Sequence, residues 1–405
     1  MKVIVIGGGA GGMLAGITAS RNGNEIILLE KNEKLGKKIY ITGKGRCNLS
    51  NFCDINDFLK NVVNNPKFLM SSIYAFSPRA TYDFFEDNGL KLKVERGNRV
   101  FPESDNASDV TKTLEKLLIS SGVDVSLNTT VTDILVENGI VKGVLTDKGK
   151  ILADKVLVST GGISYPATGS TGDGYKFAKK CGHSIIPTKA SLCGIELYGN
   201  DFLELQGLSL KNVQINCVLN GKSLYNDFGE MLFTHFGISG PIVLSASALL
   251  NNYTNHNVEI LIDLKPALEP SVIEKRLLNE FSIDGNKQIS SIIRGYVPST
   301  LVSLIIKKAG LSPNKKCAEI TKTERQNIIN TLKGLQVTFK KLRPIEEAIV
   351  TSGGVNVKEI NPKTMESKLC KGLYFAGEVL DVDCFTGGFN LQTAFSTGYL
   401  AGQNI

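Results

Sequence analysis

Residues 1–31 read MKVIVIGGGAGGMLAGITASRNGNEIILLEK, and they are the most informative stretch of the chain. The β-branched apolar run Lys2 to Ile6 predicts a buried strand, and Met13 to Asn22 predicts a helix after the glycines. Glu25 to Leu29 predicts a second apolar strand. A strand, a glycine-rich turn, a helix and a strand in this order predict the first βαβ unit of a doubly wound α/β domain.

The glycines of this stretch have the spacing of a dinucleotide-binding turn. Gly7, Gly9 and Gly12 fit G-x-G-x-x-G, and Glu30 ends the second predicted strand. The first glycine allows the tight turn, the second lets a pyrophosphate approach the backbone, and the third lets helix and strand pack closely. An acid at the position of Glu30 accepts hydrogen bonds from ribose hydroxyls. Because the motif lies between two strands and is followed by this acid, it indicates a dinucleotide site.

Composition places the chain among soluble globular proteins. Its 405 residues leave room for two or three domains, and 42% hydrophobic and 21% charged residues are ordinary values. The sequence opens directly on a predicted strand, and no apolar run reaches the ~18 residues of a membrane span. The 8 cysteines contain no C-x-x-C pair, so we expect neither a zinc site nor a disulfide framework. These features predict a cytoplasmic protein without a membrane partner or a metal.

The excess of positive charge belongs to one segment. The net charge is +7, and Lys265 to Arg343 holds 15 Lys and Arg against 6 Asp and Glu. This segment could face a nucleic acid, an anionic substrate or a partner, but a solvated lysine-rich helical surface is the favoured interpretation. Nucleic-acid binding therefore stays open as the less favoured alternative.

A basic loop follows the first βαβ unit. Gly36 to Lys44 contains three lysines and two glycines, and Arg46 comes next. Such a loop could wrap a dinucleotide with its cations on the phosphates, or it could be a mobile basic loop. Cys47 and Cys53 have C-x5-C spacing, which differs from the C-x4-C of dithiol flavoprotein reductases, so a redox dithiol is disfavoured.

The middle of the first half predicts further strands and a capped helix. A small meander appended to the nucleotide domain is expected from three apolar runs, Val123 to Leu127, Val131 to Val136 and Val141 to Thr146. Lys155 to Val158 predicts a strand that leads to Gly161 and Gly162, where a cofactor could lie against the bare backbone. Asp173 is placed to cap a helix from Tyr175 to Cys181.

A change of pattern after residue 187 predicts an insert. Short strands and turn signals from Pro187 to Lys265 indicate a small β-barrel, and Leu268 to Leu335 indicates three to five short helices. A strand from Leu335 to Arg343 would close the insert. The predicted parts are a nucleotide-binding domain of residues 1–188 and 344–405, a barrel of residues 189–266 and 334–343, and a helical part of residues 267–333.

The pattern of the last sixty residues is typical of a segment that binds the ribitol and flavin half of FAD. Lys371 to Glu378 predicts a strand that ends in Gly-Glu, and Thr386 to Ala401 predicts a helix that opens on glycines. The acid could take ribitol hydroxyls, and the helix N-terminus could stabilise negative charge on a reduced flavin. Together with the N-terminal motif, this pattern predicts one FAD clamped by both ends of the chain.

Several motifs resemble the bacterial BaiN-like FAD-dependent oxidoreductases, a family that includes aminoacetone oxidases and bile-acid 3-dehydro-Δ4,6-reductases. The matching motifs are GGGAGGMLAG at 7–16, TGKGRCNLSN at 42–51, GSTGDGY at 169–175, FTHFGISGP at 233–241, and GLYFAGEVLDVD and TGGFNLQTAFSTG between 372 and 398. The resemblance implies a Rossmann-like FAD-binding domain with a doubly wound, mostly parallel sheet, an inserted β-barrel and a helical subdomain.

The resemblance also implies site residues. It places FAD contacts at Gly7, Gly9, Gly12, Glu30, Lys31, Arg46, Cys47, Asn48, Val131, Gly162, Gly377, Glu378, Asp381, Asn390 and Leu391. Two features depart from the family pattern, which often has glycine at the position of Lys44 and is richer in glycine at Cys384 and Phe385.

These features predict an FAD-dependent oxidoreductase that transfers a hydride through flavin N5 to or from a small organic or steroid-like substrate. NADH or NADPH would visit through the substrate cleft, because FAD takes the one dinucleotide motif. Tyr165 and His235 are the candidate proton-handling residues. Three alternatives stay open: an oxygen-using oxidase of a small amine, a flavin-dependent RNA-modifying or RNA-binding protein, and a non-catalytic flavin sensor. The sequence does not predict the oligomeric state.

Overall fold

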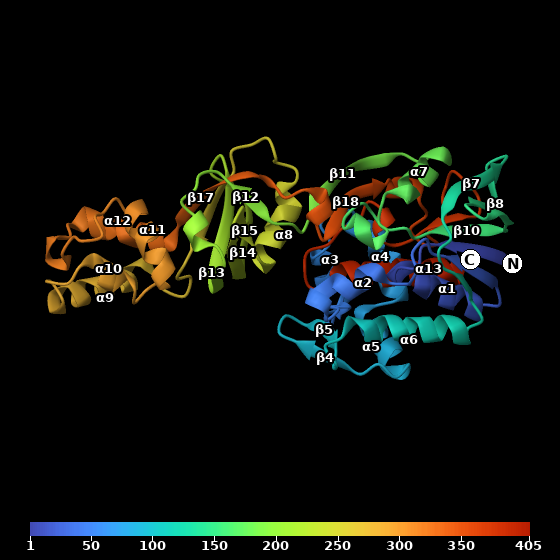
Figure 1. Ribbon diagram of the computed structural model, residues 1–405, viewed down its shortest axis with the longest axis horizontal. Helices are drawn as coiled ribbons and strands as arrows, with labels where there is room; N and C mark the ends of the chain where they lie inside the picture. The colour runs from blue at the N-terminus through green and yellow to red at the C-terminus, as the bar shows by residue number, and fades with distance from the viewer. The chain divides into compact units, whose positions relative to one another are not determined.

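The computed structural model describes residues 1–405 (Figure 1). The chain folds into two compact units, one of Met1–Ser191 with Pro344–Ile405 and the other of Leu192–Arg343. No helix combines the length and the apolar character that crossing a bilayer requires.

A five-stranded parallel sheet forms the centre of the first unit. Its strand order is β19 (Leu373–Phe375), β10 (Lys155–Val158), β1 (Lys2–Ile6), β2 (Glu25–Leu29) and β6 (Asp124–Ser126). Neighbouring strands pair in parallel, and the three central strands are largely buried. Apolar residues on both faces of a strand are what a sheet covered by helices on both sides requires. The predicted doubly wound α/β fold is confirmed.

The prediction of the sheet to which one strand belongs is wrong. We expect Val123 to Leu127 in the meander, but β6 pairs with the edge of β2, with Asp124 opposite Ile27. The meander consists of β7 (Val131–Glu137), β8 (Ile140–Thr146) and β9 (Gly149–Leu152). Local periodicity predicts that a strand exists, but its partner depends on tertiary packing, which short segments do not encode.

Two helices from opposite ends of the chain pack on the sheet and on each other. These are α1 (Ala10–Arg21) and α13 (Phe389–Asn404), and both termini lie close to this region in Figure 1. A Cβ added to Gly398 would lie 2.2 Å from the Gly11 carbonyl oxygen, so the two backbones touch where neither residue has a side chain. This contact brings the first and last segments of the chain to the same edge of the sheet.

The other helices of the first unit surround this core. They are α2 (Lys37–Ile41), α3 (Ile55–Lys60), α4 (Pro66–Ala75), α5 (Pro78–Asp87), α6 (Ala107–Ser120) and α7 (Asp173–Lys180). Small antiparallel pairings join β3 (Ser50–Asn51), β5 (Arg99–Pro102) and β4 (Leu92–Glu95), and separately β11 (Ile185–Ser191) and β18 (Val350–Val355). Pro66 and Pro78 each stand in the first turn of a helix, where the missing N–H has no acceptor to lose.

The expected cap of α7 is wrong. The helix begins at Asp173 itself, and its N-cap is Gly172, with φ of 79° and no side-chain cap. Asp173 instead directs its carboxylate to Lys31. An ion pair with a residue 142 positions earlier competes with capping, and a local pattern cannot reveal it.

The second unit contains a closed antiparallel barrel. Its strands follow the order β12 (Ile195–Leu197), β15 (Gly237–Ser239), β14 (Lys222–Thr234), β13 (Ser209–Leu219), β16 (Glu259–Asp263) and β17 (Leu335–Leu342), and α8 (Pro241–Leu250) lies within the same segment. Strand β17 pairs with β16 and β12, so the barrel closes only after the helical segment has been completed.

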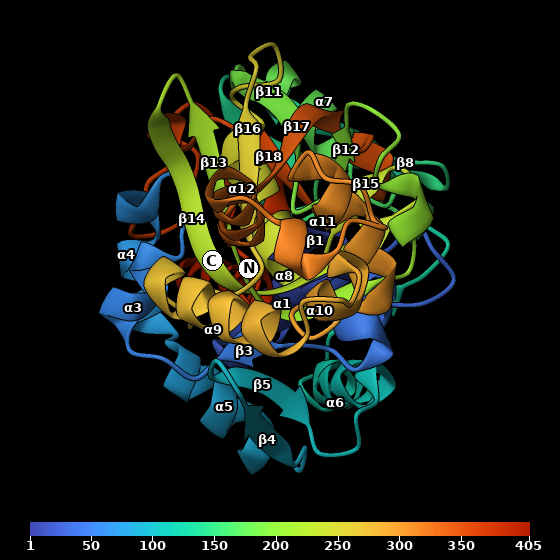
Figure 2. The same ribbon diagram turned by 90° about the vertical axis from the view of Figure 1, so that its left-hand side faces the viewer.

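The helical segment contains four α-helices, shown face-on in Figure 2. They are α9 (Pro270–Ile283), α10 (Ile289–Ile293), α11 (Val302–Lys308) and α12 (Lys322–Lys333). A capping box of Thr321 and Glu324 starts α12. Several cations of the helical segment form ion pairs, such as Lys315 with Glu324 and Arg325 with Glu274.

Candidate functional site

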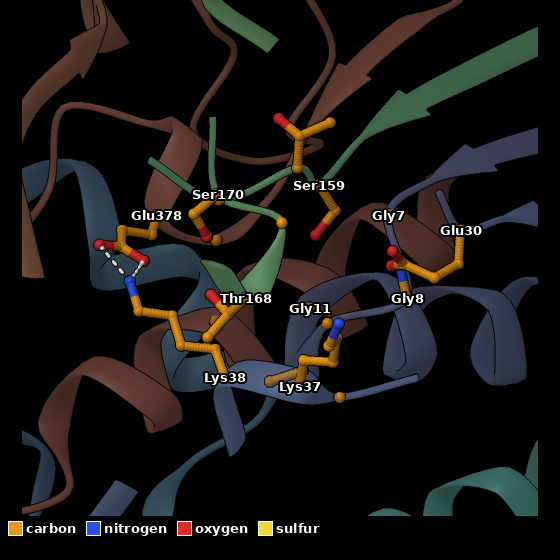
Figure 3. A pocket seen from close by; sticks show the side chains of 18 of the residues that line it. Gly7, Gly8, Gly11, Glu30, Lys37, Lys38, Ser159, Thr168, Ser170 and Glu378 are labelled. Atoms are coloured by element: carbon orange, nitrogen blue, oxygen red, sulfur yellow. Dashed lines mark hydrogen bonds and ion pairs between the residues drawn. The ribbon is translucent and has the colours of Figure 1, made fainter. Parts of the chain in front are cut away.

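A cavity of about 1310 Å³, including its open mouth, lies in the first unit at the carboxyl ends of the parallel strands. The turns after β1, β2, β10 and β19 line it with Gly7–Gly11, Glu30, Ser159–Gly161 and Gly377–Glu378 (Figure 3). Ligands of doubly wound folds bind at this edge of the sheet.

The N-terminus of α1 forms an open cradle in the cavity wall. Its N-cap, Gly9, gives no side-chain hydrogen bond, and the first turn holds no acid. A Cβ added to Gly9 would meet nothing within 4 Å, whereas one added to Gly12 would lie 2.0 Å from the Gly7 carbonyl oxygen. The space above Gly9 is therefore free for a phosphate, while Gly12 serves close packing. These residues fit the pyrophosphate of FAD.

Glu30 shapes the same wall. It is 8% exposed, and one carboxylate oxygen accepts the Gly8 N–H at 2.8 Å. The other oxygen accepts the backbone N–H of Asn32 at 2.9 Å and its side-chain amide at 2.6 Å. The carboxylate thus holds the glycine turn and lines the cavity. Val131, at the start of β7, lines it as well.

Lys31 connects the end of β2 to the start of α7. Its Nζ lies 2.7 Å from Asp173 Oδ2 and 2.5 Å from Thr171 Oγ1. Burial alone would raise the pKa of Asp173, but the hydrogen bonds from Lys31 and Thr171 outweigh burial and lower it. Both charged residues line the cavity and neutralise each other.

A second ion pair lies in the cavity away from Glu30. Lys38 Nζ contacts both carboxylate oxygens of Glu378, at 2.7 and 3.0 Å, and Ser164 Oγ at 2.6 Å (Figure 3). Glu378 also accepts the backbone N–H of Thr351 at 2.8 Å. Gly377 precedes this carboxylate and lines the cavity.

The start of α13 reaches the cavity through Asn390, and Asn48 holds the N-cap of this helix. Asn48 accepts the Gly388 N–H at 3.0 Å when its amide is oriented by its neighbours, and Gly388 is the N-cap of α13. Asn390 accepts the Cys384 N–H at 2.9 Å and donates to the Cys384 carbonyl at 2.9 Å. Asn390 and Leu391 line the cavity, whereas Asn48 supports the turn from behind.

Arg46 and Cys47 do not line the cavity. The guanidinium of Arg46 binds Glu95 and Asp105 and lies 4.2 Å from the ring centroid of Phe101. Hydrogen bonds to Glu95 and then Asp105 raise the pKa of Arg46. Cys47 is fully buried, and burial raises the pKa of its thiol to about 12.

Asp381, Gly162 and Gly12 also lie behind the cavity wall. Asp381 accepts the Asn65 side-chain amide at 2.9 Å, and burial raises its pKa. A Cβ at Gly162 would lie 2.4 Å from Thr351 Oγ1, so this glycine permits the packing of β18. Their part in FAD binding stays a prediction.

The two candidate proton-handling residues lie in different units. Tyr165, in the first unit, is half-buried with φ of 49° and precedes the 3-10 turn η2 (Pro166–Thr168). His235, in the second unit, is exposed in the turn between β14 and β15, with its ring centroid 5.1 Å from that of Phe236. Neither lines the cavity described above, and their catalytic roles stay predictions.

Sequence patterns missed several residues of the cavity wall. The missed residues are Ser159, Thr160 and Ser170, whereas Lys37 and Lys38, which also line the cavity, belong to the basic loop that the sequence offers for a dinucleotide. Thr160 Oγ1 is buried and has no hydrogen-bond partner. A Cβ added to Gly174 would lie 2.3 Å from this oxygen, so the hydroxyl faces the start of α7. The signal that could have found Thr160 is its place at the end of β10, beside Gly161.

Comparisons with known proteins agree with this geometry. The family model described as HI0933-like protein Rossmann domain matches residues 1–404. The 3-dehydro-bile acid delta(4,6)-reductase of Clostridium scindens is 31% identical, and the alignment covers 99% of this chain and 98% of the relative. The ribosomal RNA dihydrouridine synthase of Haemophilus influenzae is 30% identical, with 99% of this chain and 98% of the relative covered.

A solved structure has the same fold. The 3-ketosteroid delta1-dehydrogenase of Sterolibacterium denitrificans superposes with a TM-score of 0.53 at 14% identity, covering 99% of this chain and 98% of that structure. The family match spans nearly the whole chain, and the resemblance seen in the sequence motifs is confirmed. The protein therefore belongs to the HI0933-like Rossmann family and is an FAD-dependent oxidoreductase.

Proposed function

We propose that the protein uses FAD to add two hydrogens across a carbon–carbon double bond next to a carbonyl group, with NADH or NADPH as the electron donor. The observation that carries the FAD part of the proposal is a single cavity that joins the α1 N-terminus, Glu30 and Glu378 from both ends of the chain. The two curated relatives support the reaction class. One is named a reductase of a 3-dehydro bile acid, and the other forms dihydrouridine. Both names describe hydrogen addition to a conjugated double bond.

The residues of the cavity would bind and orient the cofactor. Bound FAD supplies two-electron chemistry at its flavin ring. The N–H groups at the start of α1 would hold the pyrophosphate, because nothing occupies the space above Gly9. Glu30 would accept a ribose hydroxyl and Glu378 a ribitol hydroxyl. The N-terminus of α13 would stabilise negative charge near Asn390 and Leu391.

NADH or NADPH would bind only transiently. The chain carries one G-x-G-x-x-G motif, at Gly7 to Gly12, and FAD would occupy it. A second dinucleotide would therefore visit transiently through the substrate cleft. The protein would then alternate between the donor and the substrate. Tyr165 through its phenol, or His235 through its imidazole, would supply the proton that completes the reduction.

Small-molecule reduction is the favoured assignment, because the bile-acid reductase is the relative with the higher identity of the two, at 31%. A steroid-like enone is the substrate class that its name suggests. The protein would then reduce a polycyclic substrate that carries a keto group beside the double bond.

Uridine in RNA is the second candidate. Two observations favour it: the 30% identity to a ribosomal RNA dihydrouridine synthase, and the 15 Lys and Arg against 6 Asp and Glu between Lys265 and Arg343. A basic surface of this kind binds the phosphate backbone, with affinity that falls steeply as salt rises. Lys275, Arg294 and Lys322, on or beside the helices of this segment, would contribute.

Anaerobic spectroscopy tests the proposal. The purified protein should carry a flavin that NADH or NADPH bleaches, and a 3-keto-4,6-diene steroid should restore the absorbance with loss of the diene band. If ribosomal RNA restores it instead, and mass spectrometry finds dihydrouridine in that RNA, the second candidate holds. Hydrogen peroxide release with a small amine, without nicotinamide bleaching, would contradict both and indicate an oxidase. A flavin that no donor reduces would indicate a sensor.

A further inference from the structure

Lys38 and Glu378 form an ion pair on the cavity wall. The ammonium spans both carboxylate oxygens, and their side chains are 23% and 20% exposed. Figure 3 shows Lys38 reaching up from α2 to Glu378, which belongs to the 3-10 turn η8 (Gly377–Val379). The contact joins segments 340 residues apart in sequence.

One oxygen of Glu378 is saturated and the other is not. Oε1 accepts Lys38 at 3.0 Å, the Ser164 hydroxyl at 3.0 Å and the Thr351 N–H at 2.8 Å. Oε2 accepts Lys38 at 2.7 Å and lies 3.9 Å from the position of a Cβ at Gly161. Gly161 lines the cavity, so Oε2 is the atom that can accept a hydroxyl of the ligand.

The carboxylate needs a compensating charge. FAD brings two negative charges on its pyrophosphate into the same cavity, and repulsion between partly buried charges is poorly screened. Among the other acids of the wall, Asp173 is compensated by Lys31, and Glu30 is held by N–H donors of Gly8 and Asn32. Glu378 without Lys38 would therefore be an uncompensated carboxylate facing an anionic ligand.

We propose that Lys38 is a positioning residue that makes FAD binding possible by neutralising Glu378 and turning its Oε2 toward the ligand, and that Lys38 does not itself bind the phosphates. Its two donors to Glu378 and its donor to Ser164 account for all three N–H groups of the ammonium. Nothing remains for a phosphate contact while the pair is intact.

A double-mutant cycle tests this role through the affinity of the apoprotein for FAD, measured by quenching of flavin fluorescence. Lys38→Met should weaken binding about tenfold. In the Glu378→Gln background, Lys38→Met should weaken FAD binding by less than about threefold, because no carboxylate remains to be neutralised. Lys38→Arg should keep the affinity within about threefold, since the guanidinium can hold the carboxylate.

Lys34→Met is the matched control. Lys34 is an exposed lysine just before α2, its Nζ lies 4.4 Å from the ring centroid of Tyr40, and it does not line the cavity. It should leave the affinity unchanged. An equal loss for K34M would mean that only net charge matters, and it would overturn the proposal.

The opposite result of the cycle would show a direct phosphate contact. In that case Lys38→Met would cost about tenfold in both backgrounds. Should K38M alone fail to fold, the comparison of E378Q with K38M/E378Q still decides, because neither variant contains the uncompensated carboxylate. A loss of about tenfold in that comparison overturns the proposal, and a loss below threefold supports it.

Discussion

At the scale of single residues, Glu30 holds the glycine turn and would accept a ribose hydroxyl. One substitution removes both roles. Glu30→Ala removes the acceptor of the Gly8 N–H and of the Asn32 amide groups, and it removes the acceptor for a ribose hydroxyl. A hydrogen bond from a ligand hydroxyl to a charged group contributes ~1.5–3 kcal/mol, so its loss predicts a decrease in FAD affinity of about tenfold or more. Titration of the apoprotein with FAD measures it, and an unchanged dissociation constant would contradict the assignment.

The cysteines give a prediction of reactivity. Burial raises the pKa of Cys47, Cys217 and Cys384 to about 12, so these thiols stay protonated at pH 8. Iodoacetamide should leave all three unmodified in the native protein and should label them in guanidinium chloride, as peptide mass spectrometry would show. Rapid labelling of native Cys47 would restore the dithiol interpretation that its spacing to Cys53 disfavours.

The sequence predicted those site residues whose role depends on their immediate neighbours. Gly7, Gly9 and Glu30 belong to one local motif, and all three line the cavity. Arg46 was expected at the ligand because it is a cation in a basic loop, but its neighbours in space are Glu95 and Asp105. Side-chain direction of this kind depends on residues about 50 positions away, which no local pattern reports.

At the scale of elements, the first turn of α1 separates folding from binding. Gly12→Ala would place a Cβ 2.0 Å from the Gly7 carbonyl and should destabilise the fold, whereas a Cβ at Gly9 meets nothing. Gly9→Ala should therefore melt near the wild-type apoprotein but lose FAD, because its methyl group occupies the phosphate space. Thermal unfolding and flavin content measure the two effects. An FAD-loaded G9A variant would contradict the cradle.

Elements were predicted more reliably than their partners. The strands at Lys2–Ile6 and Glu25–Leu29 have the predicted bounds, because apolar β-branched runs between glycines are a strong local signal. The place of β6 and the cap of α7 were wrong, because strand pairing and the Lys31–Asp173 ion pair are decided by contacts between distant segments. The strand predicted from Leu335 to Arg343 is confirmed as β17, and its pairing with β16 and β12 closes the barrel.

At the scale of the whole molecule, a buried histidine predicts how stability depends on pH. His183 Nδ1 lies 3.1 Å from Glu359 Oε2, and His183 Nε2 lies 2.7 Å from Ser367 Oγ. Burial lowers the pKa of His183 below its ordinary 6.5, despite the opposing effect of Glu359. As the pH falls through 6.5, the unfolded chain therefore binds a proton before the folded chain does, and stability decreases.

His183→Gln should flatten this part of the profile of unfolding free energy against pH between about 7 and 5. Exposed His256 offers the matched control, and His256→Gln should leave the profile as it is. Urea unfolding at several pH values measures both. A wild-type protein whose stability rises toward pH 5 would contradict the assignment. Burial alone would raise the pKa of Glu359, but hydrogen bonds from Ser184 and His183 outweigh burial and lower it. The free energy of unfolding should therefore decrease further as the pH falls below about 4.5.

The central claim is that both ends of the chain bind one FAD in a single cavity. The most direct test is to release the cofactor from the purified protein, identify it by chromatography, and count it per chain. We expect FAD, close to one molecule per chain, and its loss in the Gly9→Ala variant with the fold retained. A colourless protein that takes up no added FAD, or a wild-type protein that carries FMN instead, would contradict it.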